Sequence, residues 1–289
     1  MLKVFLYLSA FKMSYVLCIE TATKSCSVAL SKEGQLVGVK EHVSEQYSHS
    51  EQLTVFIKEL LDQHQLSTTD LSAIAISSGP GSYTGLRIGV STAKGLCYAL
   101  DIPLISISTL EAMSELMKND FADYVLCPLI DARRMEVYCA LFGKNQSPVS
   151  AKIIDEHSFA KELASHKILF FGDGAAKCQE VITHPNAHFE LGVYPSARSM
   201  IGLAHQKFLA QDFEDVAYYE PFYLKEFVAG VKGKWYSVLV ESGPEGYFVI
   251  HIVSLRISLS KYIFYFFFRY DLGRFYYFYG WGFLKVERF

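Results

Sequence analysis

The residues most able to support chemistry form a glycine-rich stretch that reads Gly79-Pro80-Gly81-Ser82-Tyr83-Thr84-Gly85-Leu86-Arg87-Ile88-Gly89. An apolar run at 71–76 precedes it and a helix-type pattern follows it, an order in which backbone N–H groups can hold a phosphate. Neither common phosphate fingerprint fits, because the lysine pair of a P-loop is missing and Thr84 replaces the third glycine of a dinucleotide site. We therefore expect a tight turn that leads into a packing helix, with phosphate binding as the alternative.

Charged residues at the ends of expected strands are the next candidates. Glu20 closes an apolar strand pattern and could serve metal or base chemistry, but no clear second acid accompanies it. Asp131 with Arg133 and Arg134 could bind an acidic group. The simpler interpretation is a hairpin turn between strands, in which an ion pair at the surface stabilises little.

Histidines offer little evidence of a metal site. His184 and His188 have a spacing that would chelate a metal on a helix, but Pro185-Asn186 between them predicts a turn in an exposed loop. His49 falls in the first turn of a predicted helix, where the dipole disfavours the imidazolium. We expect His49 to be exposed, with a hydrogen bond at an interface as the alternative.

The elements that position these residues form two groups. In the first, strand patterns alternate with helix patterns in the order β-β-β-α-β-α-β, and a capping box of Ser48 and Glu51 starts the first helix. The strands are expected at 15–23, 25–30, 36–43, 71–76 and 102–107, and the helices at 48–62 and 84–100. This is the order of one lobe of the actin, Hsp70 and sugar-kinase superfamily. The expected fold class is α/β, with two actin-like (ribonuclease H-like) lobes of mixed sheets flanked by helices.

Lobe boundaries and chain ends follow from the same patterns. We expect the first lobe, with the dimerisation helices, at 13–115 and the second at 116–233. In the second lobe, strands are expected at 124–130, 135–142 and 167–171, and helices at 158–165, after Gly174 and at 196–209. Residues 1–12 are interpreted as an upstream extension before Met13, with a secretory signal as the alternative. The aromatic-rich tail at 234–289 is interpreted as non-native translation, with a membrane-surface anchor as the alternative.

Composition limits the function classes. A net charge of −3 gives no basic field for nucleic acid over the whole chain. The six cysteines include no Cys-x-x-Cys pair, which indicates buried thiols in a reducing compartment and makes a zinc site improbable. We expect a cytoplasmic protein without a membrane partner.

Several motifs together resemble the bacterial TsaB (YeaZ) family of tRNA threonylcarbamoyladenosine biosynthesis proteins. The resemblance covers about residues 13–230, and its most specific part is the glycine-rich stretch. The other motifs are Cys18-Ile19-Glu20-Thr21-Ala22-Thr23, Ser48-His49-Ser50-Glu51-Gln52-Leu53, Asp131-Ala132-Arg133-Arg134-Met135-Glu136-Val137-Tyr138, Phe171-Gly172-Asp173-Gly174-Ala175 and Glu220-Pro221-Phe222-Tyr223-Leu224-Lys225.

The resemblance implies a non-catalytic partner of the TsaD transferase, which forms threonylcarbamoyladenosine at position 37 of tRNAs reading codons that begin with A. It implies TsaD and TsaE as partners, a homodimer when alone, and tRNA contact only through the complex. No catalytic residue, metal site or firmly bound cofactor is expected, and ATP or ADP would sit at the complex interface. The alternative is an enzyme of the same fold, either an ATPase or kinase or a glycoprotease-like metalloenzyme.

The same resemblance assigns residues to two surfaces. The partner and dimer interface is expected at Ser48, His49, Gln52, Gly81, Ser82, Tyr83, Thr84, Gly85, Arg87 and Gly89. The positions nearest a nucleotide are expected at Glu20, Thr21, Thr23, Gly172, Asp173 and Gly174, although an ordinary turn favours the last three equally. If the glycines pack against a partner, Gly85→Leu should leave the monomer folded and weaken pairing.

One stretch bears on catalysis. TsaD proteins hold a metal through a His-x-x-x-His pair, and the equivalent positions here are Thr109 and Met113. Neither side chain is a strong ligand for a hard metal. The sequence therefore favours the partner role over the transferase or glycoprotease role.

Overall fold

The computed structural model describes residues 14–44, 49–225 and four short strands between 239 and 278. The chain divides into two compact units, Met1–Glu226 and Phe227–Phe289. The second unit contains two antiparallel pairs, β11 (Leu239–Ser242) with β12 (Phe248–His251) and β13 (Phe267–Asp271) with β14 (Arg274–Phe278). The interpretations of residues 1–12 and of most of the tail lie outside the described residues and stay predictions.

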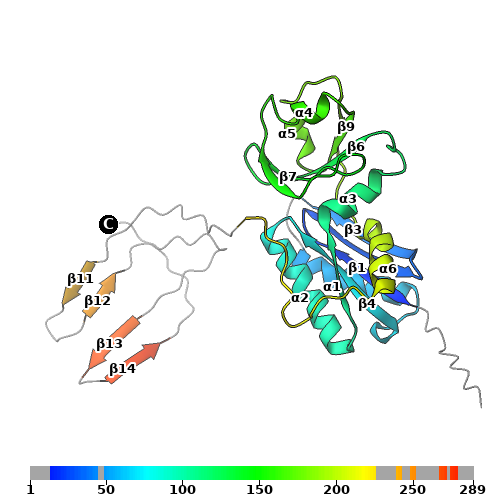
Figure 1. The fold of residues 1–289 in the computed structure, drawn as a ribbon. Helices are drawn as coiled ribbons and strands as arrows, with labels where there is room; N and C mark the ends of the chain where they lie inside the picture. The colour runs from blue at the N-terminus through cyan, green and yellow to red at the C-terminus, as the bar shows by residue number, and fades with distance from the viewer. Residues whose placement is uncertain are drawn as a thin grey trace, which may run out of the picture. The chain divides into compact units, whose positions relative to one another are not determined.

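The first sheet of the larger unit has the strand order β3-β2-β1-β4-β5 (Figure 1). Strands β3, β2 and β1 are antiparallel, whereas β1, β4 and β5 run parallel, so the sheet is mixed. The strands are β1 (Tyr15–Glu20), β2 (Ser25–Lys32), β3 (Gln35–Val43), β4 (Leu71–Gly79) and β5 (Leu104–Ser108). Helices α1 (His49–Gln63) and α2 (Tyr83–Leu100), with the short 3-10 helix η1 (Thr68–Asp70), complete the element order expected from the sequence.

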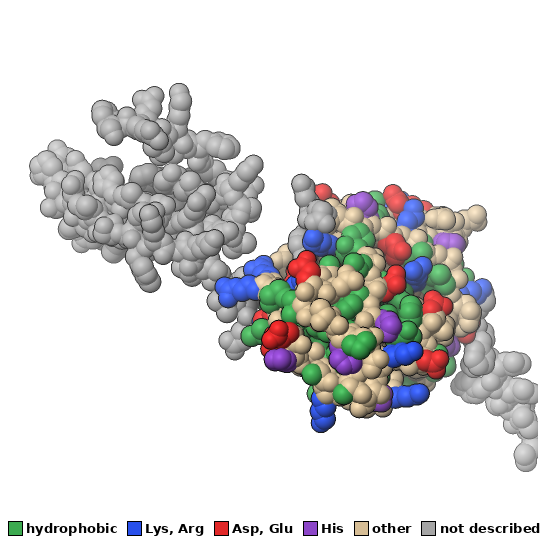
Figure 2. Space-filling model, turned by 90° about the horizontal axis from the view of Figure 1, so that it is seen from above, with side chains coloured by type: hydrophobic (Ala, Val, Ile, Leu, Met, Phe, Trp, Pro, Cys, Tyr) green, Lys and Arg blue, Asp and Glu red, His purple; other side chains and the backbone are tan. Residues whose placement is uncertain are grey.

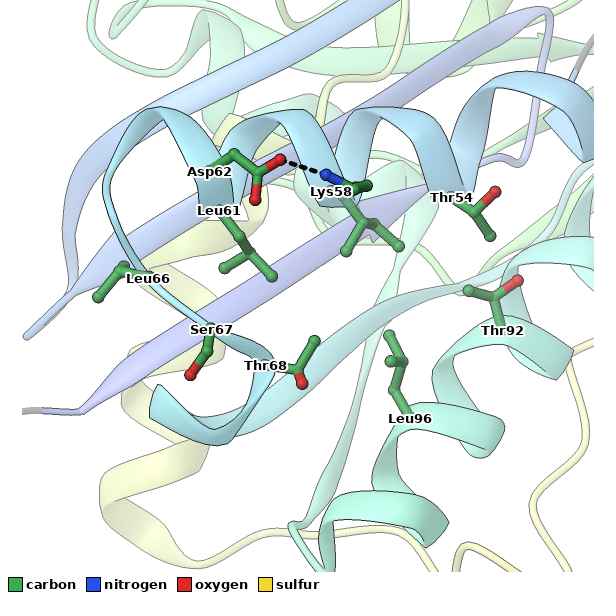
Figure 3. Close-up of a pocket in the computed structure, with 10 residues that line it drawn as sticks. Thr54, Lys58, Leu61, Asp62, Leu66, Ser67, Thr68, Thr92 and Leu96 are labelled. Carbon is green, nitrogen blue, oxygen red and sulfur yellow. Dashed lines mark hydrogen bonds and ion pairs between the residues drawn. The ribbon is translucent and has the colours of Figure 1, made fainter.

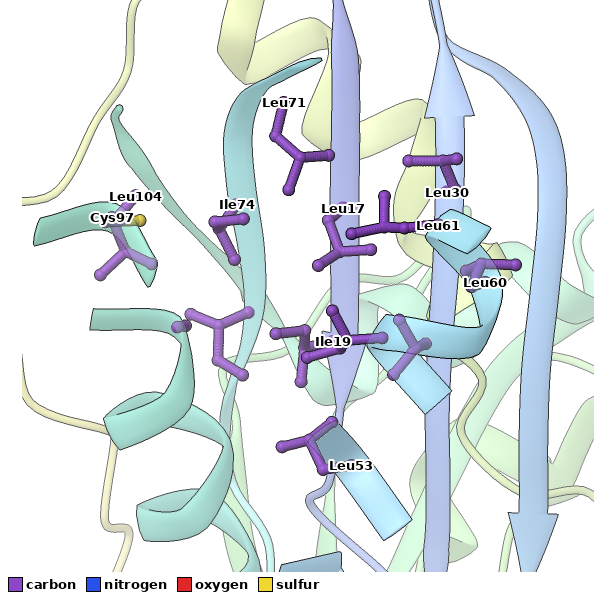
Figure 4. Packing of buried hydrophobic residues seen from close by; sticks show 14 of the residues in the cluster. Leu17, Ile19, Leu30, Leu53, Leu60, Leu61, Leu71, Ile74, Cys97 and Leu104 are labelled. Atoms are coloured by element: carbon purple, nitrogen blue, oxygen red, sulfur yellow. The ribbon is translucent and has the colours of Figure 1, made fainter. Parts of the chain in front are cut away.

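Alternation along β1 divides the core of this lobe between two faces of the sheet. Leu17 and Ile19 face α1 and α2, and Figure 4 shows them beside Leu53 and Leu60 of α1. The intervening residues of β1 face the other side, where η2 (Ala197–Met200) and α6 (Ile201–Ala210) cover them. Because successive side chains of a strand point to opposite faces, one apolar strand supplies both layers of the core.

The second sheet has the strand order β10-β9-β6-β7-β8. Its strands are β6 (Val125–Asp131), β7 (Glu136–Cys139), β8 (Ser150–Ile153), β9 (Ile168–Phe171) and β10 (Ala187–Glu190). Helices α4 (Ala160–Leu163) and α5 (Ala175–Gln179) contribute to the core on one face, and α3 (Thr109–Met117) covers the other. Two mixed five-stranded sheets flanked by helices confirm the expected fold class.

The helix at 196–209, expected in the second lobe, belongs instead to the first. Ala204 of α6 and Met200 of η2 pack in the same cluster as Val16 of β1. Glu41 of β3 fixes the start of η2, because its carboxylate accepts a hydrogen bond of 2.6 Å from Ser196 Oγ. Residues 197–210 of the expected second lobe, 116–233, therefore pack on the first sheet, because the chain returns to that sheet after β10.

Candidate functional site

The glycine-rich stretch packs against the turn between β1 and β2. A Cβ atom added at Gly85 would lie 2.1 Å from the carbonyl oxygen of Thr21, and one at Gly81 would lie 2.4 Å from that of Ala22. A Cβ at Gly89 would lie 2.2 Å from Thr21 Oγ1. Only glycine permits this close approach of α2 to the turn, which is the packing role that the sequence favoured.

Hydrogen bonds within the chain engage several N–H groups at the start of α2. Ser82 N donates to the carbonyl oxygen of Ala22 over 2.6 Å, and Gly85 N donates to Ser82 Oγ over 3.3 Å. In return, Thr21 Oγ1 donates to the carbonyl oxygen of Gly85 over 2.9 Å. The start of α2 is thus bonded to its own chain, and this use of its donors disfavours the phosphate alternative.

The contact that Gly85 and Gly89 make corrects one expectation from the sequence. Both residues are buried within the chain, and their close neighbour is Thr21 rather than a second protein. A leucine at position 85 would meet backbone atoms of the β1–β2 turn. The expectation that Gly85→Leu leaves the monomer folded is therefore wrong.

His49 is buried rather than exposed. Its side chain is 2% exposed, and Nε2 lies 2.7 Å from the carbonyl oxygen of Thr23. Burial lowers the pKa of the imidazole, although the bond to Thr23 opposes this effect. His49 therefore fastens α1 to the same turn that the glycines contact. Ser48, its expected neighbour at the interface, lies outside the described residues.

The remaining interface candidates are at least partly accessible to solvent. Thr84 and Arg87 are exposed, and Gln52, Ser82 and Tyr83 are half-buried. The Arg87 guanidinium stacks 4.3 Å from the centre of the Tyr83 ring, and its Nε donates to Tyr223 Oη over 3.4 Å. This arrangement holds the arginine side chain against the start of α2 while leaving it accessible.

A groove of about 280 Å³ runs between α1 and α2 near the end of α1 (Figure 3). Leu61 of α1 and Leu96 of α2 contribute apolar side chains, and Thr54 and Thr92 lie at its other end. The ion pair of Lys58 with Asp62, which the figure marks, lies along α1. Both helices that the sequence assigned to the partner interface thus share one recessed surface.

Glu20 stands at the carboxyl end of β1 and is fully buried. One carboxylate oxygen accepts a hydrogen bond of 2.5 Å from Ala22 N, whereas the other has no hydrogen-bond partner among the described residues. Burial raises the pKa of this carboxyl from 4.5 to about 7, and the bond from Ala22 opposes the rise. Thr21 and Thr23, the other first-lobe candidates, are also buried.

The second-lobe candidates lie at the carboxyl end of β9. Gly172 has a φ of 110°, and a Cβ there would lie 2.3 Å from the carbonyl oxygen of Leu129, so glycine is required. Gly174 is buried, and Asp173 accepts a hydrogen bond of 2.9 Å from Asp131 N. Burial is the main cause that raises the pKa of Asp173. The hydrogen bond from Asp131 N opposes that rise, and the positive charge of Lys24 lowers the same pKa.

Thr109 and Met113 begin α3, which packs between the lobes. Both side chains are buried, and Met113 packs with residues of the second sheet. The Met113 methyl carbon lies 2.9 Å from where a Cβ on Gly172 would stand. Of the two positions that would carry metal-binding histidines, Met113 therefore packs against the second lobe and Thr109 is buried at the start of α3.

Lys177 is the residue that the sequence analysis missed at this edge. Its Nζ donates to the carbonyl oxygens of Arg134 over 2.8 Å and Glu136 over 2.7 Å, and it pairs with the Asp131 carboxylate. It thereby holds the turn between β6 and β7, whose hairpin form was predicted. No pattern in the sequence links a lysine of α5 to this turn.

Further observations concern the cysteines, histidines and helices. All six cysteines are free and buried, as expected. The segment of His184 forms a turn, but His188 lies in β10, which was not predicted. Among the described residues, no three His, Cys, Asp or Glu side chains are grouped to hold a metal. None of the described helices combines the length and the apolar composition needed to cross a membrane.

Comparisons with known proteins give relatives over most of the chain. A model of the family described as tRNA N6-adenosine threonylcarbamoyltransferase, TsaD, matches residues 38–232. The tRNA threonylcarbamoyladenosine biosynthesis protein TsaB of Escherichia coli is 30% identical over 227 residues, which cover 75% of this chain and 97% of that protein. TsaB of Haemophilus influenzae is 29% identical over 231 residues, which cover 75% and 96%. The solved structure of YeaZ from Pseudomonas aeruginosa has a TM-score of 0.61 and 26% identity, and the match covers 73% of this chain and 100% of that one.

Proposed function

Since this chain belongs to the TsaB family of tRNA threonylcarbamoyladenosine biosynthesis proteins, we propose that it is a non-catalytic partner subunit of a TsaD transferase. In this role it supports formation of threonylcarbamoyladenosine at position 37 of tRNAs in the cytoplasm. TsaE is the third component, and the chain pairs with a second copy when TsaD is absent.

The observation that carries the proposal is the packing of Thr109 and Met113. A transferase of this type would place metal-binding histidines there, whereas this chain has a buried hydroxyl and a thioether in contact with the second lobe. Neither group is a good ligand for a hard metal, and Met113 already contributes to the core. The start of α2 likewise uses its N–H donors within the chain. We therefore propose no firmly bound cofactor, and we place ATP or ADP at the junction with the partner.

The surface proposed for the partner is the α1–α2 face. It combines the groove of Figure 3 with the exposed side chains of Thr84 and Arg87 and the half-buried Gln52 and Tyr83. An apolar groove beside polar, accessible side chains has the composition of a specific interface, with an apolar centre and a polar rim.

Reconstitution of the modification tests the proposal. Purified TsaD and TsaE are incubated with tRNA, threonylcarbamoyl-adenylate and ATP, with and without this chain. We expect modified adenosine 37 only when the chain is present. Equal modification without it would remove the proposed role, and steady ATP turnover by the isolated chain would contradict its non-catalytic nature.

A further inference from the structure

The turn between β6 and β7 has an unusual backbone. Arg133 and Arg134 adopt φ angles of 67° and 50°, both in the left-handed region. The turn is closed by hydrogen bonds from Ala132 N to the carbonyl oxygen of Glu136 and from Glu136 N to that of Arg133. Positive φ favours glycine and asparagine, because a larger side chain with a Cβ is strained there. A pair of arginines is therefore a poor choice for the turn alone, and such strain persists only where the surroundings hold it.

Lys177 and Asp131 supply those surroundings. Lys177 donates to the carbonyl oxygens of Arg134 and Glu136, and Asp131 Oδ1 accepts a hydrogen bond of 3.0 Å from Arg133 N. These bonds fix the backbone of the arginine hairpin, by which we mean residues 131–136. They leave the two arginine side chains unrestrained at its tip.

Both guanidinium groups are available to a ligand. Arg133 and Arg134 are exposed, and neither guanidinium has a hydrogen bond or an ion pair within the part of the chain that the structure describes. The nearby acids are already engaged, since Asp131 pairs with Lys177 and Glu136 pairs with Lys225. Two free guanidiniums on a fixed backbone suit phosphate oxygens, which arginine binds through a planar fork of donors.

We propose that the arginine hairpin contacts backbone phosphates of the tRNA substrate, an inference that rests on the proposed function. A free nucleotide presents the same phosphate chemistry, so binding of ATP or ADP is measured separately in the test below. On the second-lobe face in Figure 2, basic and acidic side chains are interspersed, so a local pair with fixed geometry, rather than a broad basic field, would bind the RNA.

A double substitution separates ligand binding from folding. Arg133→Asn with Arg134→Gly supplies residues that tolerate positive φ, so we expect an unfolding temperature equal to or above that of the native chain. In the assembled complex with TsaD, we expect tRNA affinity to fall about tenfold at low salt. The dependence of log affinity on log salt should weaken by about 1 to 2, as for two lost phosphate contacts.

The matched control removes the same charge elsewhere on the second lobe. Lys144→Gln with Lys161→Gln changes two exposed lysines, and we expect its tRNA affinity to stay within twofold of native. Arg133→Gln with Arg134→Gln keeps the original backbone and should reproduce the loss, which covers the case in which the first variant fails to fold.

Three results would overturn the proposal. One is unchanged tRNA affinity in both hairpin variants. Another is lost binding of TsaD or TsaE with tRNA contact intact, which would assign the hairpin to an acidic protein surface. The third is weakened binding of ATP or ADP alone. Failure of the native chain to bind TsaD would instead refute the proposed function. That outcome is measured without tRNA, so it is distinguished from failure of the arginine hairpin to bind tRNA.

Discussion

At the residue scale, the buried carboxyl of Glu20 makes stability depend on pH. Its pKa rises from 4.5 to about 7 on folding. Below pH 4.5 both the folded and the unfolded state carry the proton, so the carboxyl does not lower the free energy of unfolding. Between pH 4.5 and 7 the unfolded state loses its proton first, and the folded state therefore loses stability as pH rises. Above pH 7 the free energy of unfolding stays lowered by about 3 kcal/mol, at roughly 1.4 kcal/mol for each unit by which the pKa is raised.

Glu20→Gln should remove this dependence. The amide keeps an oxygen for the hydrogen bond from Ala22 N and carries no charge. We expect the variant to have a free energy of unfolding at pH 8 that is higher than native by up to about 3 kcal/mol. Position 20 of the variant should also contribute no change in that free energy between pH 4.5 and 7. Urea unfolding of both proteins across this pH range measures it, and a variant that is less stable than native at pH 8 would disprove the account.

Gly85 provides a second prediction, with a control in the same helix. Gly85→Ala places a methyl group 2.1 Å from a backbone oxygen of Thr21, and overpacking of this kind costs about 1–3 kcal/mol. Gly95 has nothing within 4 Å of its added Cβ, so Gly95→Ala should stabilise the helix by about 0.5–1 kcal/mol. Thermal unfolding of the two variants should move in opposite directions. Equal shifts would show that α2 can move away from the turn.

These residues also show what the sequence could reveal about the site. The spacing of Gly81, Gly85 and Gly89 predicts close packing correctly, because small residues recurring every four positions allow another segment to approach the backbone closely. Spacing does not identify the surface that is approached, since a partner and the chain's own turn need the same glycines. The burial of His49 was missed for a related reason, because its bond to Thr23 joins segments far apart in the sequence.

At the element scale, the proposed partner surface can be tested on α1. Val55 is 47% exposed and adjoins the groove residue Thr54 in the sequence of α1. Val55→Asp should leave the unfolding temperature unchanged and weaken association with TsaD about tenfold or more, because the interface would bury an unpaired charge.

Ile153 provides the matched control for this change. It is 73% exposed on β8 of the second lobe, so Ile153→Asp makes the same chemical change outside the proposed surface. Affinities from titration calorimetry should separate the two variants. If both bind TsaD equally well, the α1–α2 face is not where the partner binds.

The elements of the first lobe were predictable because their patterns are long and regular. Strands β1 and β4 are apolar runs, and α1 and α2 show apolar residues at helical spacing. Strands β8 and β10 were missed because they are four-residue edge strands, whose conformation depends on the neighbouring strand more than on their own residues. Helix α3 was also missed, since it is short and packs against both lobes.

At the scale of the molecule, the chain crosses between lobes in a way that local pattern could not predict. The apolar stripe of α6 shows that the helix packs on a sheet, but either sheet would satisfy that pattern. After α6, residues 212–225 form a strap over the first lobe. Glu214 N donates to the carbonyl oxygen of Leu104 over 2.8 Å, and Phe222 N donates to that of Ser78 over 2.7 Å. The strap then reaches the second lobe, where Lys225 pairs with Glu136.

Lys94 of α2 should govern how often the strap opens. Its Nζ donates to the carbonyl oxygens of Ala217 and Tyr219, at 3.2 and 3.0 Å. Lys94→Met keeps the apolar stem and removes both bonds, which should lower the free energy of local opening by about 1 kcal/mol. We therefore expect the strap amides of Glu214 and Phe222 to exchange hydrogen about fivefold faster, with the amides of β1 unchanged.

The comparison that decides this prediction is Lys58→Met. Lys58 is an exposed lysine of α1 that pairs with Asp62 on its own helix and, among the described residues, has no bond to the strap, so its loss should not alter exchange at Phe222. Because Phe222 lies over Gly79, where a Cβ would stand 2.6 Å from its carbonyl oxygen, opening of the strap also uncovers the glycine-rich turn. Unchanged exchange in Lys94→Met would mean that the backbone bonds to Leu104 and Ser78 hold the strap without help from α2.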